Sequence, residues 1–270
     1  MFRRLCPLAV AVAALCLAGD TACKPDAPCY GEDGIVNIAS GTPGAVAPNT
    51  LASLFGTRLS YLEKGLALSD AAGGVLPTVL PGTGVRVWVG GVAAPIFYVS
   101  ATQVNFLVPG SLRPTTVDVQ VFRDGVVGPL VPMRLREAAP ALFLMDPQFV
   151  IASHLDFALV TADAPARPGA WVVLWATGLG KSDVGLAGPD VIPSQAAWIV
   201  RQSEFRVLLN GTAVPPERIA YVGLAPLCAG LYQINLLLPS DADPDPEVRI
   251  AVGTETSPAG TRLHLREPAN

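Results

Sequence analysis

The sequence predicts an all-β protein with many turns, and three observations point to this fold class. Glycine and proline contribute 26 residues each to a chain of 270, and both are unfavourable inside helices. Hydrophobic residues make up 51% of the chain and charged residues only 15%, which excludes global disorder. Short apolar runs alternate with turn residues at the spacing of a β-sandwich. The length predicts one or two domains.

The N-terminus has the pattern of a secretory signal peptide. Arg3 and Arg4 precede the apolar run at 5–18, whose 14 residues are too few to span a bilayer, which takes about 20. Small residues favour cleavage after Ala18, with Ala22 as the second choice. We therefore expect residues 1–18 to be removed and the mature chain to be exported without a transmembrane span. An uncleaved membrane anchor is the alternative.

Cysteine use fits an oxidising compartment. Cys23 and Cys29 lie six positions apart in the N-terminal segment 19–34 and are expected to close a small disulfide loop. Lipid attachment to Cys23 is the alternative, although Asp20 stands where a lipoprotein signal prefers an aliphatic residue. The pairing of Cys228 stays open. Only two histidines exist, neither near a cysteine, so no zinc site is predicted.

The rest of the chain repeats itself once. At an offset of 120 residues, 48–60 aligns with 168–180 and 85–95 aligns with 205–215. Further matches, after an insertion in the second copy, pair 98–109 with 221–239, 117–121 with 248–252 and 133–137 with 263–267. We expect one β-sandwich over 35–142 and a second over 143–270.

Turn residues mark the same hairpin in both copies. Gly90-Gly91 and Asn210-Gly211 each separate two apolar runs, which is the strongest short-range hairpin signal. Asn210 also begins a glycosylation sequon, but its alignment with Gly90 favours a turn. Helical periodicity is absent beyond the leader, and residues 60–70 are expected to form one helical turn or a loop.

Four segments carry a specific resemblance: LASLFGTRLS, VWVGGVAAPIFYVSATQVNFLVP, WVVLWATGLG and VGLAPLCAGLYQINLLLP. They resemble an uncharacterised Solibacter-type C-terminal domain family, which occurs at the ends of secreted proteins of soil bacteria. Its members resemble tandem IPT/TIG immunoglobulin-like domains. The resemblance covers roughly residues 35–267. It implies an immunoglobulin-like fold and no catalytic residues. This chain departs from the family in that the repeat follows the leader almost directly.

Charge excludes two classes of partner. The net charge is −4, the isoelectric point is about 5.2, and no basic run follows Arg3 and Arg4. Nucleic-acid binding is therefore not expected, because phosphate contacts supply most of its affinity. The chain also lacks a polybasic segment that would hold an anionic membrane.

Catalytic, metal and cofactor chemistry are not expected either. His154 and His264 are the only histidines, and no G-x-S-x-G elbow is present. The run 178–182 is similar to a phosphate loop, but Trp175 stands where that pattern needs glycine. The acidic segment 240–247 is a candidate calcium loop, but a solvated loop without a metal is the favoured interpretation.

The candidate binding residues are outward-facing aromatics and an arginine. In the run 85–89, Arg86 and Trp88 alternate with three valines that must face the core. Trp171 and Trp175 share a second outer face, which either packs within the protein or binds a ligand. We expect an exported, non-catalytic binding or structural module of the bacterial envelope or exterior, whose partner is an extracellular protein or a polysaccharide. The alternatives are a carbohydrate-binding accessory module, a structural spacer and a hydrolase.

Overall fold

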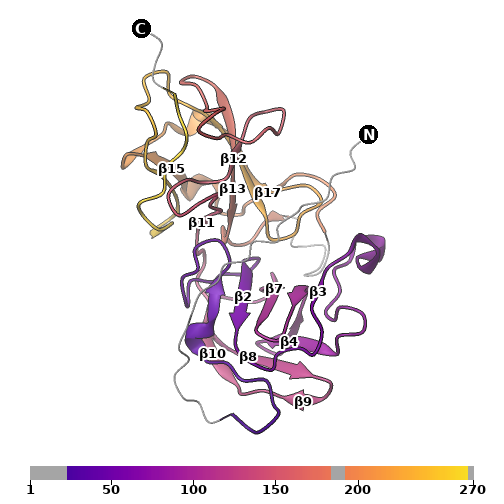
Figure 1. Cartoon of the computed structure of the whole chain (residues 1–270). Coiled ribbons are helices and arrows are strands. Elements are labelled where there is room, and N and C mark those ends of the chain that lie inside the picture. The colour runs from indigo at the N-terminus through magenta and orange to yellow at the C-terminus, as the bar shows by residue number, and fades with distance from the viewer. Residues whose placement is uncertain (1–22, 184–191, 267–270) are drawn as a thin grey trace.

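The structure is a computed structural model that describes residues 23–183 and 192–266 (Figure 1). These residues form four antiparallel sheets and no α-helix, so the predicted all-β class is confirmed. The 3-10 helices have three residues each: η1 Glu32–Gly34, η2 Leu68–Asp70, η3 Ala72–Gly74, η5 Gln202–Glu204 and η6 Pro216–Arg218. No helix in the described ranges has the length and apolarity to cross a membrane. The expected signal peptide lies outside these ranges.

The first sandwich is the pair of sheets in the first half of the chain. One sheet has the order β1-β2-β7-β6-β3, and the other has the order β10-β8-β4-β5, with β9 paired to β8. The strands are β1 Ile35–Asn37, β2 Leu51–Phe55, β3 Lys64–Gly65, β4 Val85–Val89, β5 Val92–Ala94, β6 Ile96–Val99, β7 Gln103–Leu107, β8 Thr116–Arg123, β9 Val126–Val127 and β10 Val131–Arg134.

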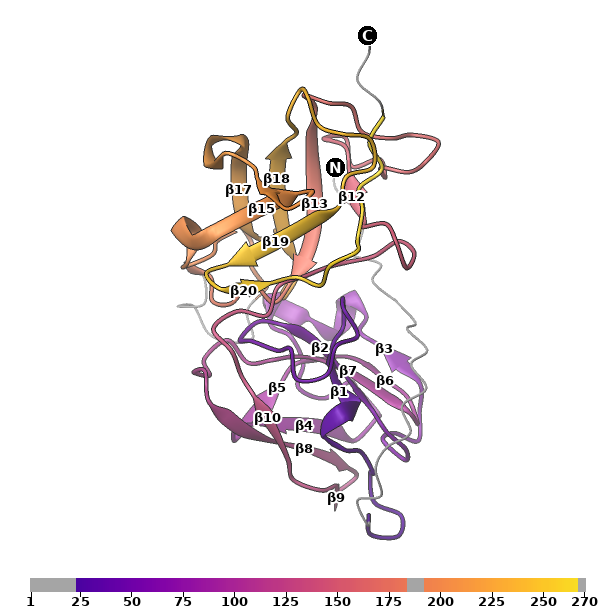
Figure 2. The ribbon, with the colours of Figure 1, turned by 90° about the vertical axis from the view of Figure 1, so that its left-hand side faces the viewer.

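The second sandwich follows with the same plan. One sheet has the order β11-β13-β18-β17-β14, with β12 paired to β13, and the other has the order β16-β15-β19-β20. The strands are β11 Ala141–Leu142, β12 Ala152–Ser153, β13 Trp171–Thr177, β14 Ala197–Trp198, β15 Phe205–Leu209, β16 Thr212–Ala213, β17 Ile219–Leu224, β18 Tyr232–Leu237, β19 Val248–Val252 and β20 Glu255–Thr256. Figure 2 shows the second sandwich, in orange and yellow, above the first.

The first sandwich has immunoglobulin-like strand order, and β11, β13, β15, β16, β17, β18 and β19 repeat its first seven positions in the second sandwich. If β1, β2, β4, β5, β6, β7, β8 and β10 are lettered A, B, C, C′, D, E, F and G, the two sheets read ABED and GFCC′. The aligned segments of the repeat occupy equivalent strands, β2 with β13, β4 with β15, β7 with β18 and β8 with β19. The hairpin residues Gly90, Gly91, Asn210 and Gly211 all have positive φ, between 47° and 80°, as a type I′ turn requires.

Each sandwich has its own hydrophobic core. The first core runs from Tyr30 to Leu135 and the second from Ala138 to Leu265. Strand β11 pairs with β13, so the chain enters the second sandwich slightly before the expected boundary after residue 142. Backbone pairing assigns β11 to a sheet of the second sandwich, and sequence similarity between the copies does not reveal this pairing. That each sandwich is a separate domain stays a prediction.

The N-terminal segment belongs to the first sandwich. Cys23 and Cys29 form a disulfide with an S–S distance of 2.05 Å, so the sulfur of Cys23 is not open to lipid attachment in this form. Cys29 and Thr57 exchange two backbone hydrogen bonds, of 2.9 and 2.8 Å. The Tyr30 hydroxyl accepts a hydrogen bond from the Val121 amide and donates one to a backbone carbonyl, both at 2.7 Å. The segment is therefore anchored through both backbone and side chains.

A buried arginine holds the disulfide loop from inside. Arg123 is 2% exposed, and its guanidinium donates hydrogen bonds to the carbonyls of Asp26 and Arg58. The ring of Tyr61 lies 4.0 Å from its central carbon. A buried charge is costly unless it is hydrogen-bonded, and here backbone carbonyls and an aromatic face take the place of a carboxylate.

A seam of close contacts joins the sandwiches. The Thr177 hydroxyl accepts a 2.9 Å hydrogen bond from the Leu51 amide and donates a 2.8 Å bond to the Gly230 carbonyl. The Asn37 side-chain amide donates to the Ala139 carbonyl at 3.0 Å. Beside this seam, within the second sandwich, Gly178 has a φ of +78°, and a Cβ built on it would lie 2.0 Å from the Ala139 oxygen. Only glycine fits at position 178, which explains part of the ATGLG phrase.

Candidate functional site

The most exposed of the candidate tryptophans lies on strand β4. Val85, Val87 and Val89 are fully buried in the first core, whereas Arg86 and Trp88 point outward, as the alternation predicts. Trp88 is 38% exposed. Three valines with stiff side chains on the opposite face hold the strand, so the indole projects from a rigid base.

The strand register determines which residues surround Trp88. Gln120 on β8 lies directly opposite Trp88, and Phe122 lies opposite Arg86. Asp118 follows two residues along on the same face of β8. We define the Trp88 face as the set Arg86, Trp88, Asp118, Gln120, Phe122 and Arg134. Only Arg86 and Trp88 were predictable from the sequence, because pairing between strands some thirty residues apart leaves no local signal.

Polar groups on the Trp88 face are largely unused within the described part of the chain. The Gln120 amide donates a 3.1 Å hydrogen bond to the Gly128 carbonyl. No hydrogen bond or ion pair to another described residue occupies the side chains of Arg86, Asp118 and Arg134 or the Trp88 indole nitrogen. The face therefore combines one aromatic surface with donors and acceptors that can bind a ligand.

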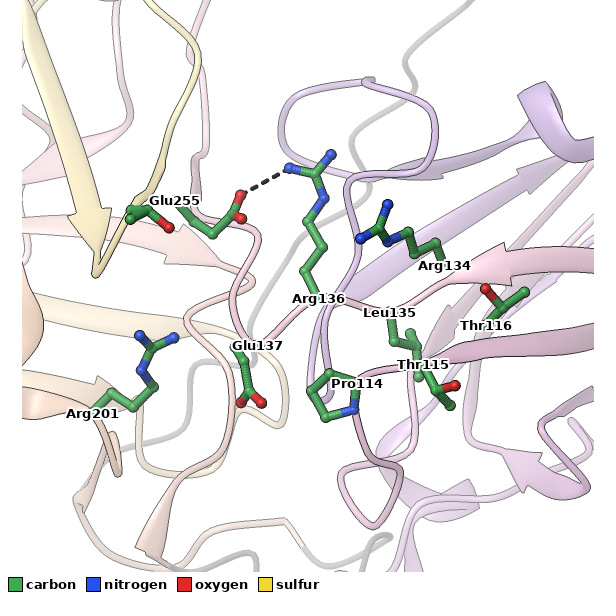
Figure 3. A pocket seen from close by; sticks show the side chains of 10 residues that line it. Pro114, Thr115, Thr116, Arg134, Leu135, Arg136, Glu137, Arg201 and Glu255 are labelled. Carbon is green, nitrogen blue, oxygen red and sulfur yellow. Dashed lines mark hydrogen bonds and ion pairs between the residues drawn. The ribbon is translucent and has the colours of Figure 1, made fainter.

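A polar groove of about 580 Å³ lies beside this face, between the two sandwiches (Figure 3). Its lining residues are Pro114, Thr115, Thr116, Arg134, Leu135, Arg136, Glu137, Arg201, Thr254 and Glu255. Arg136 and Glu255 form a 2.8 Å ion pair across the groove. Arg201 pairs with Glu204 at 2.5 Å, and this hydrogen bonding lowers the pKa of the Glu204 carboxyl.

The second candidate surface, the Trp175 face, comprises Trp171, Trp175, Gln233 and Asn235 on β13 and β18. Trp175 is half-buried against the apolar cluster that contains Phe143 and Leu231, and its indole donates a 3.2 Å hydrogen bond to the Ser153 hydroxyl. This tryptophan is therefore engaged in packing and hydrogen bonding within the protein. Trp171 is half-exposed at the other end of the strand.

A glutamine–asparagine pair recurs on this sheet in both copies. Gln233 donates to the Asn235 side-chain oxygen at 2.7 Å, and Gln103 donates to that of Asn105 at the same distance. In the first copy Asn105 also accepts a 2.8 Å hydrogen bond from the Ser53 hydroxyl. Sequence analysis did not single out these pairs, although the matching phrases QVN and QIN carried the signal.

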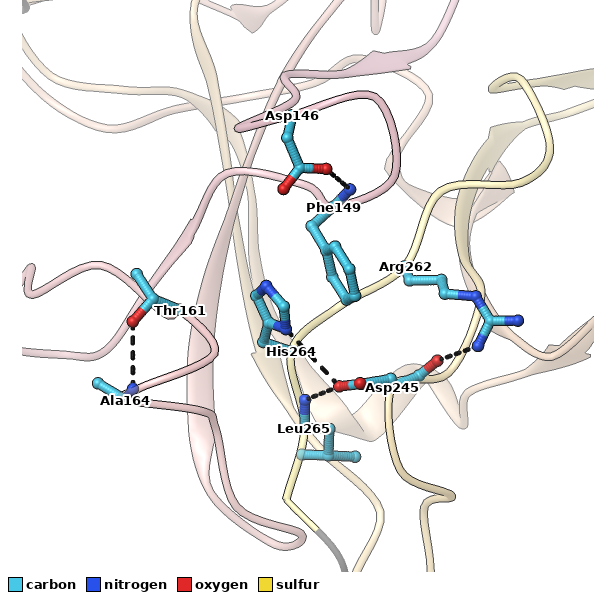
Figure 4. Close-up of polar contacts among 8 residues, drawn as sticks. All are labelled: Asp146, Phe149, Thr161, Ala164, Asp245, Arg262, His264 and Leu265. Atoms are coloured by element: carbon cyan, nitrogen blue, oxygen red, sulfur yellow. Dashed lines mark hydrogen bonds and ion pairs between the residues drawn. The ribbon is translucent and has the colours of Figure 1, made fainter.

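The histidines take part in local contacts. The His264 ring stacks on Phe149 with centroids 3.6 Å apart, and its Nδ1 lies 3.8 Å from a carboxylate oxygen of Asp245 (Figure 4). His154 Nε2 lies 3.2 Å from the Ala164 carbonyl oxygen. No hydrogen bond joins either ring to a serine hydroxyl in the described residues.

The acidic loop uses its carboxylates to hold its own shape. Asp243 accepts a hydrogen bond from the Asn210 side chain, Asp245 accepts one from the Leu265 amide, and Glu247 accepts one from the Gly260 amide. Among the described residues, no group of three or more histidine, cysteine, aspartate or glutamate side chains is placed to hold a metal ion.

No family model and no curated protein matches the chain. Among solved structures it is similar to the surface glycan-binding protein SGBP-B from the mixed-linkage glucan utilization locus of Bacteroides ovatus, in complex with a heptasaccharide (10% identity, 89% of this chain, 46% of that chain, TM-score 0.34). The surface glycan-binding protein PbSGBP-B from Prevotella bryantii is also similar (12% identity, 87% and 42%, TM-score 0.26).

A third similar structure contains the tandem Ig repeats of Dlar (11% identity, 82% of this chain, 91% of that chain, TM-score 0.21). The chain spans less than half the length of the two glycan-binding proteins. All three TM-scores lie below 0.5, so the functional assignment rests on the geometry of this chain.

Proposed function

We propose that the chain is an exported, non-catalytic carbohydrate-binding module of the bacterial cell envelope or exterior, and that the Trp88 face contacts the glycan. The observation that carries this proposal is the exposed indole of Trp88 between the side chains of Arg86 and Asp118, neither of which has a hydrogen bond or ion pair to another described residue. An aromatic face packs against the C–H groups of a sugar ring, while planar charged groups hydrogen-bond its hydroxyls.

The setting of the face supports binding without folding on contact. Three buried valines hold β4 from below, and β8 pairs with β4 over five residue pairs, from Val85–Arg123 to Val89–Val119. A ligand therefore meets a surface that is already ordered, which lowers the entropy cost of binding.

Export is supported by the disulfide and by the leader pattern. The Cys23–Cys29 bond is of a kind that persists in oxidising compartments and is rare in reducing ones. The absence of catalysis is supported by the placement of both histidines in local backbone and stacking contacts, without a nucleophile bonded to either ring among the described residues.

Co-sedimentation of the mature chain with insoluble cellulose, xylan, mannan and mixed-linkage β-glucan tests the proposal. We expect saturable binding to at least one of them, weakened about tenfold or more in Trp88→Ala, which corresponds to about 1.4 kcal/mol. Trp171→Ala is the matched control, because it removes a half-exposed tryptophan from the other face. No sedimentation of the wild-type chain at high micromolar concentration would overturn the function. Loss in Trp171→Ala alone would overturn the assignment to the Trp88 face.

A further inference from the structure

We infer that the ligand is an uncharged polysaccharide chain, and that it is bound along a path that runs from Trp88 into the groove between the sandwiches. This inference rests on the proposed function and adds a substrate class and a second contact region. Three features of the structure carry it: the continuity of the surface, the balance of its free charges, and the contribution of both sandwiches to the groove.

The Trp88 face and the groove form one surface. Gln120, Asp118 and Thr116 share one side of β8, and Arg134 on β10 lies opposite Thr116. Thr116 and Arg134 also line the groove. Four residues of strand separate Gln120 from Thr116, a distance of about 13 Å. A single sugar ring at Trp88 does not reach the groove, whereas an oligosaccharide does.

The free charges along this path cancel. Arg86 and Arg134 carry positive charges and Asp118 a negative one without a hydrogen bond or ion pair to another described residue. Glu137, whose carboxylate interacts electrostatically with Arg201, carries the second negative charge. The remaining charges of the groove are paired, Arg136 with Glu255 at 2.8 Å and Arg201 with Glu204 at 2.5 Å.

A balanced set of donors and acceptors suits hydroxyl groups. A guanidinium only donates hydrogen bonds and a carboxylate only accepts them, whereas a sugar hydroxyl does both. A polyanionic glycan would meet the Asp118 carboxylate and would be repelled by the negative net charge of the chain. These features favour a neutral glycan over one that carries uronic acids or sulfates.

Both sandwiches build the groove. In Figure 3, Arg134 and Thr116 lie on the side of the first sandwich, Arg201 and Glu255 lie on the side of the second, and Arg136 and Glu137 stand between them. Hydrogen bonds at the seam, such as that from the Leu51 amide to the Thr177 hydroxyl, hold the two sides together. The distal part of the path therefore depends on the association of the sandwiches, and the Trp88 end does not.

Calorimetric titration of the full mature chain tests the inference. The probes are cellobiose and cellohexaose, xylobiose and xylohexaose, mannobiose and mannohexaose, and hexagalacturonate. We expect a neutral hexasaccharide to bind about tenfold or more tightly than its disaccharide, with little dependence on salt, because neutral ligands are not screened. Hexagalacturonate should bind no more tightly than the neutral hexasaccharides.

Two variants separate the path from the Trp88 contact. Glu137→Gln should weaken hexasaccharide binding by about tenfold and leave disaccharide binding unchanged, whereas Trp88→Ala should weaken both. Arg134→Ala, where the Trp88 face meets the groove, should weaken hexasaccharide binding by about tenfold. Arg266→Ala and Glu32→Gln, exposed charges outside the path, are the controls.

Each outcome has one meaning. Equal affinity for short and long probes, with no effect of Arg134→Ala, would overturn the path while leaving the Trp88 site in place. Tighter binding of hexagalacturonate would overturn the neutral assignment. Absence of binding to every probe, together with absence of sedimentation with the polysaccharides, would overturn the proposed function and this inference together.

Discussion

The two copies of the repeat place their outward tryptophans on opposite sheets. In the first sandwich Trp88 lies on the β10-β8-β4-β5 sheet, and the aligned position in the second is Leu208. In the second sandwich Trp175 lies on the sheet of β11 and β13, and the aligned position in the first is Phe55. Apart from Arg123 at the end of β8, the inward positions of the aligned strands are apolar in both copies. The outward positions are the ones that differ in chemistry.

The seam accounts for part of this difference. Leu51, which aligns with Trp171, packs into the apolar clusters between the sandwiches, and Trp175 packs on the cluster that contains Phe143 and Leu231. Outward residues of the sheets that carry β2 and β13 therefore pack in the contact between the copies. In the β10-β8-β4-β5 sheet of the first sandwich, Trp88 does not pack in this contact and stays exposed.

In the β16-β15-β19-β20 sheet of the second sandwich, the outward arginines are used in hydrogen bonds within the protein. Arg206 donates a 2.6 Å hydrogen bond to the Gly253 carbonyl, and Arg249 donates to the Ser257 carbonyl at 2.9 Å. The strand register places Arg86 and Gln120 of the first copy at the positions of Arg206 and Arg249, with Gln120 two residues away from the sequence alignment of 117–121 with 248–252. The Arg86 guanidinium has no hydrogen bond or ion pair to another described residue and lies on the same face as the Trp88 indole. The same strand arrangement thus carries a Trp88 face whose arginine has no partner among the described residues and an equivalent face whose arginines bind backbone carbonyls.

The largest expected effect comes from a close backbone contact inside the second sandwich, beside the seam. Gly178→Ala should lower the free energy of unfolding by about 3 kcal/mol, because it adds left-handed backbone strain to a clash with the Ala139 carbonyl. Gly211→Ala is the control, since its φ is +80° but no atom lies within 4 Å of its added Cβ. Urea denaturation should show a loss of only about 1 kcal/mol for the control. Equal losses of stability in the two variants would contradict the close approach of Gly178 to the Ala139 carbonyl.

The two tryptophan faces should differ in stability. Trp175→Ala should cost about 2 kcal/mol, because its half-buried ring leaves a space in the seam cluster and frees the Ser153 hydroxyl. Trp88→Ala should change stability by no more than about 0.5 kcal/mol, as expected for an exposed side chain. Thermal unfolding followed by circular dichroism measures both. A large loss in Trp88→Ala would mean that Trp88 supports the fold.

The disulfide should matter only where it occurs, in the first copy. The double variant Cys23→Ser, Cys29→Ser should lose about 2 kcal/mol, as expected for a loop of this size. The wild-type chain should lose the same amount on adding dithiothreitol, and the variant should not respond to it. Equal stability of the oxidised wild type and the variant would show that Arg123 and the Cys29–Thr57 backbone bonds suffice to hold the segment.

Ionisation of the two buried tyrosines should make the stability of the chain depend on pH. Burial raises the pKa of both Tyr30 and Tyr232, and the unfolded chain ionises first, near pH 10. The stabilisation is therefore complete below about pH 10 and is lost as the pH rises further. Tyr30→Phe should cost about 1 kcal/mol at neutral pH, since it leaves the Val121 amide without an acceptor.

Urea midpoints on either side of about pH 10 provide the measurement. The double variant Tyr30→Phe, Tyr232→Phe should show a smaller fall in stability across this pH than the wild type. An unchanged fall would assign the effect to other groups.

The outward orientation of Arg86 and Trp88 was predictable because strand alternation is local: the five residues VRVWV contain both faces. The neighbours of Trp88 were not, because Asp118 and Gln120 reach it through a register set by the whole sheet. The hairpin at Asn210 was readable from its dipeptide, whereas the role of Gly178 was not. Its contact with Ala139 follows from the pairing of the chain before β11 with the end of β13, two segments some forty residues apart, which no single stretch of sequence records.

The seam also has a thermodynamic consequence for recognition. Two sandwiches on a flexible linker would each keep their own orientational freedom, and a ligand touching both would have to remove it. Here the hydrogen bonds from the Leu51 amide to the Thr177 hydroxyl and from the Asn37 side chain to the Ala139 carbonyl have already removed that freedom during folding. A saccharide that bridges the sandwiches therefore loses mainly its own conformational entropy on binding, and longer chains keep more of the free energy of each added contact.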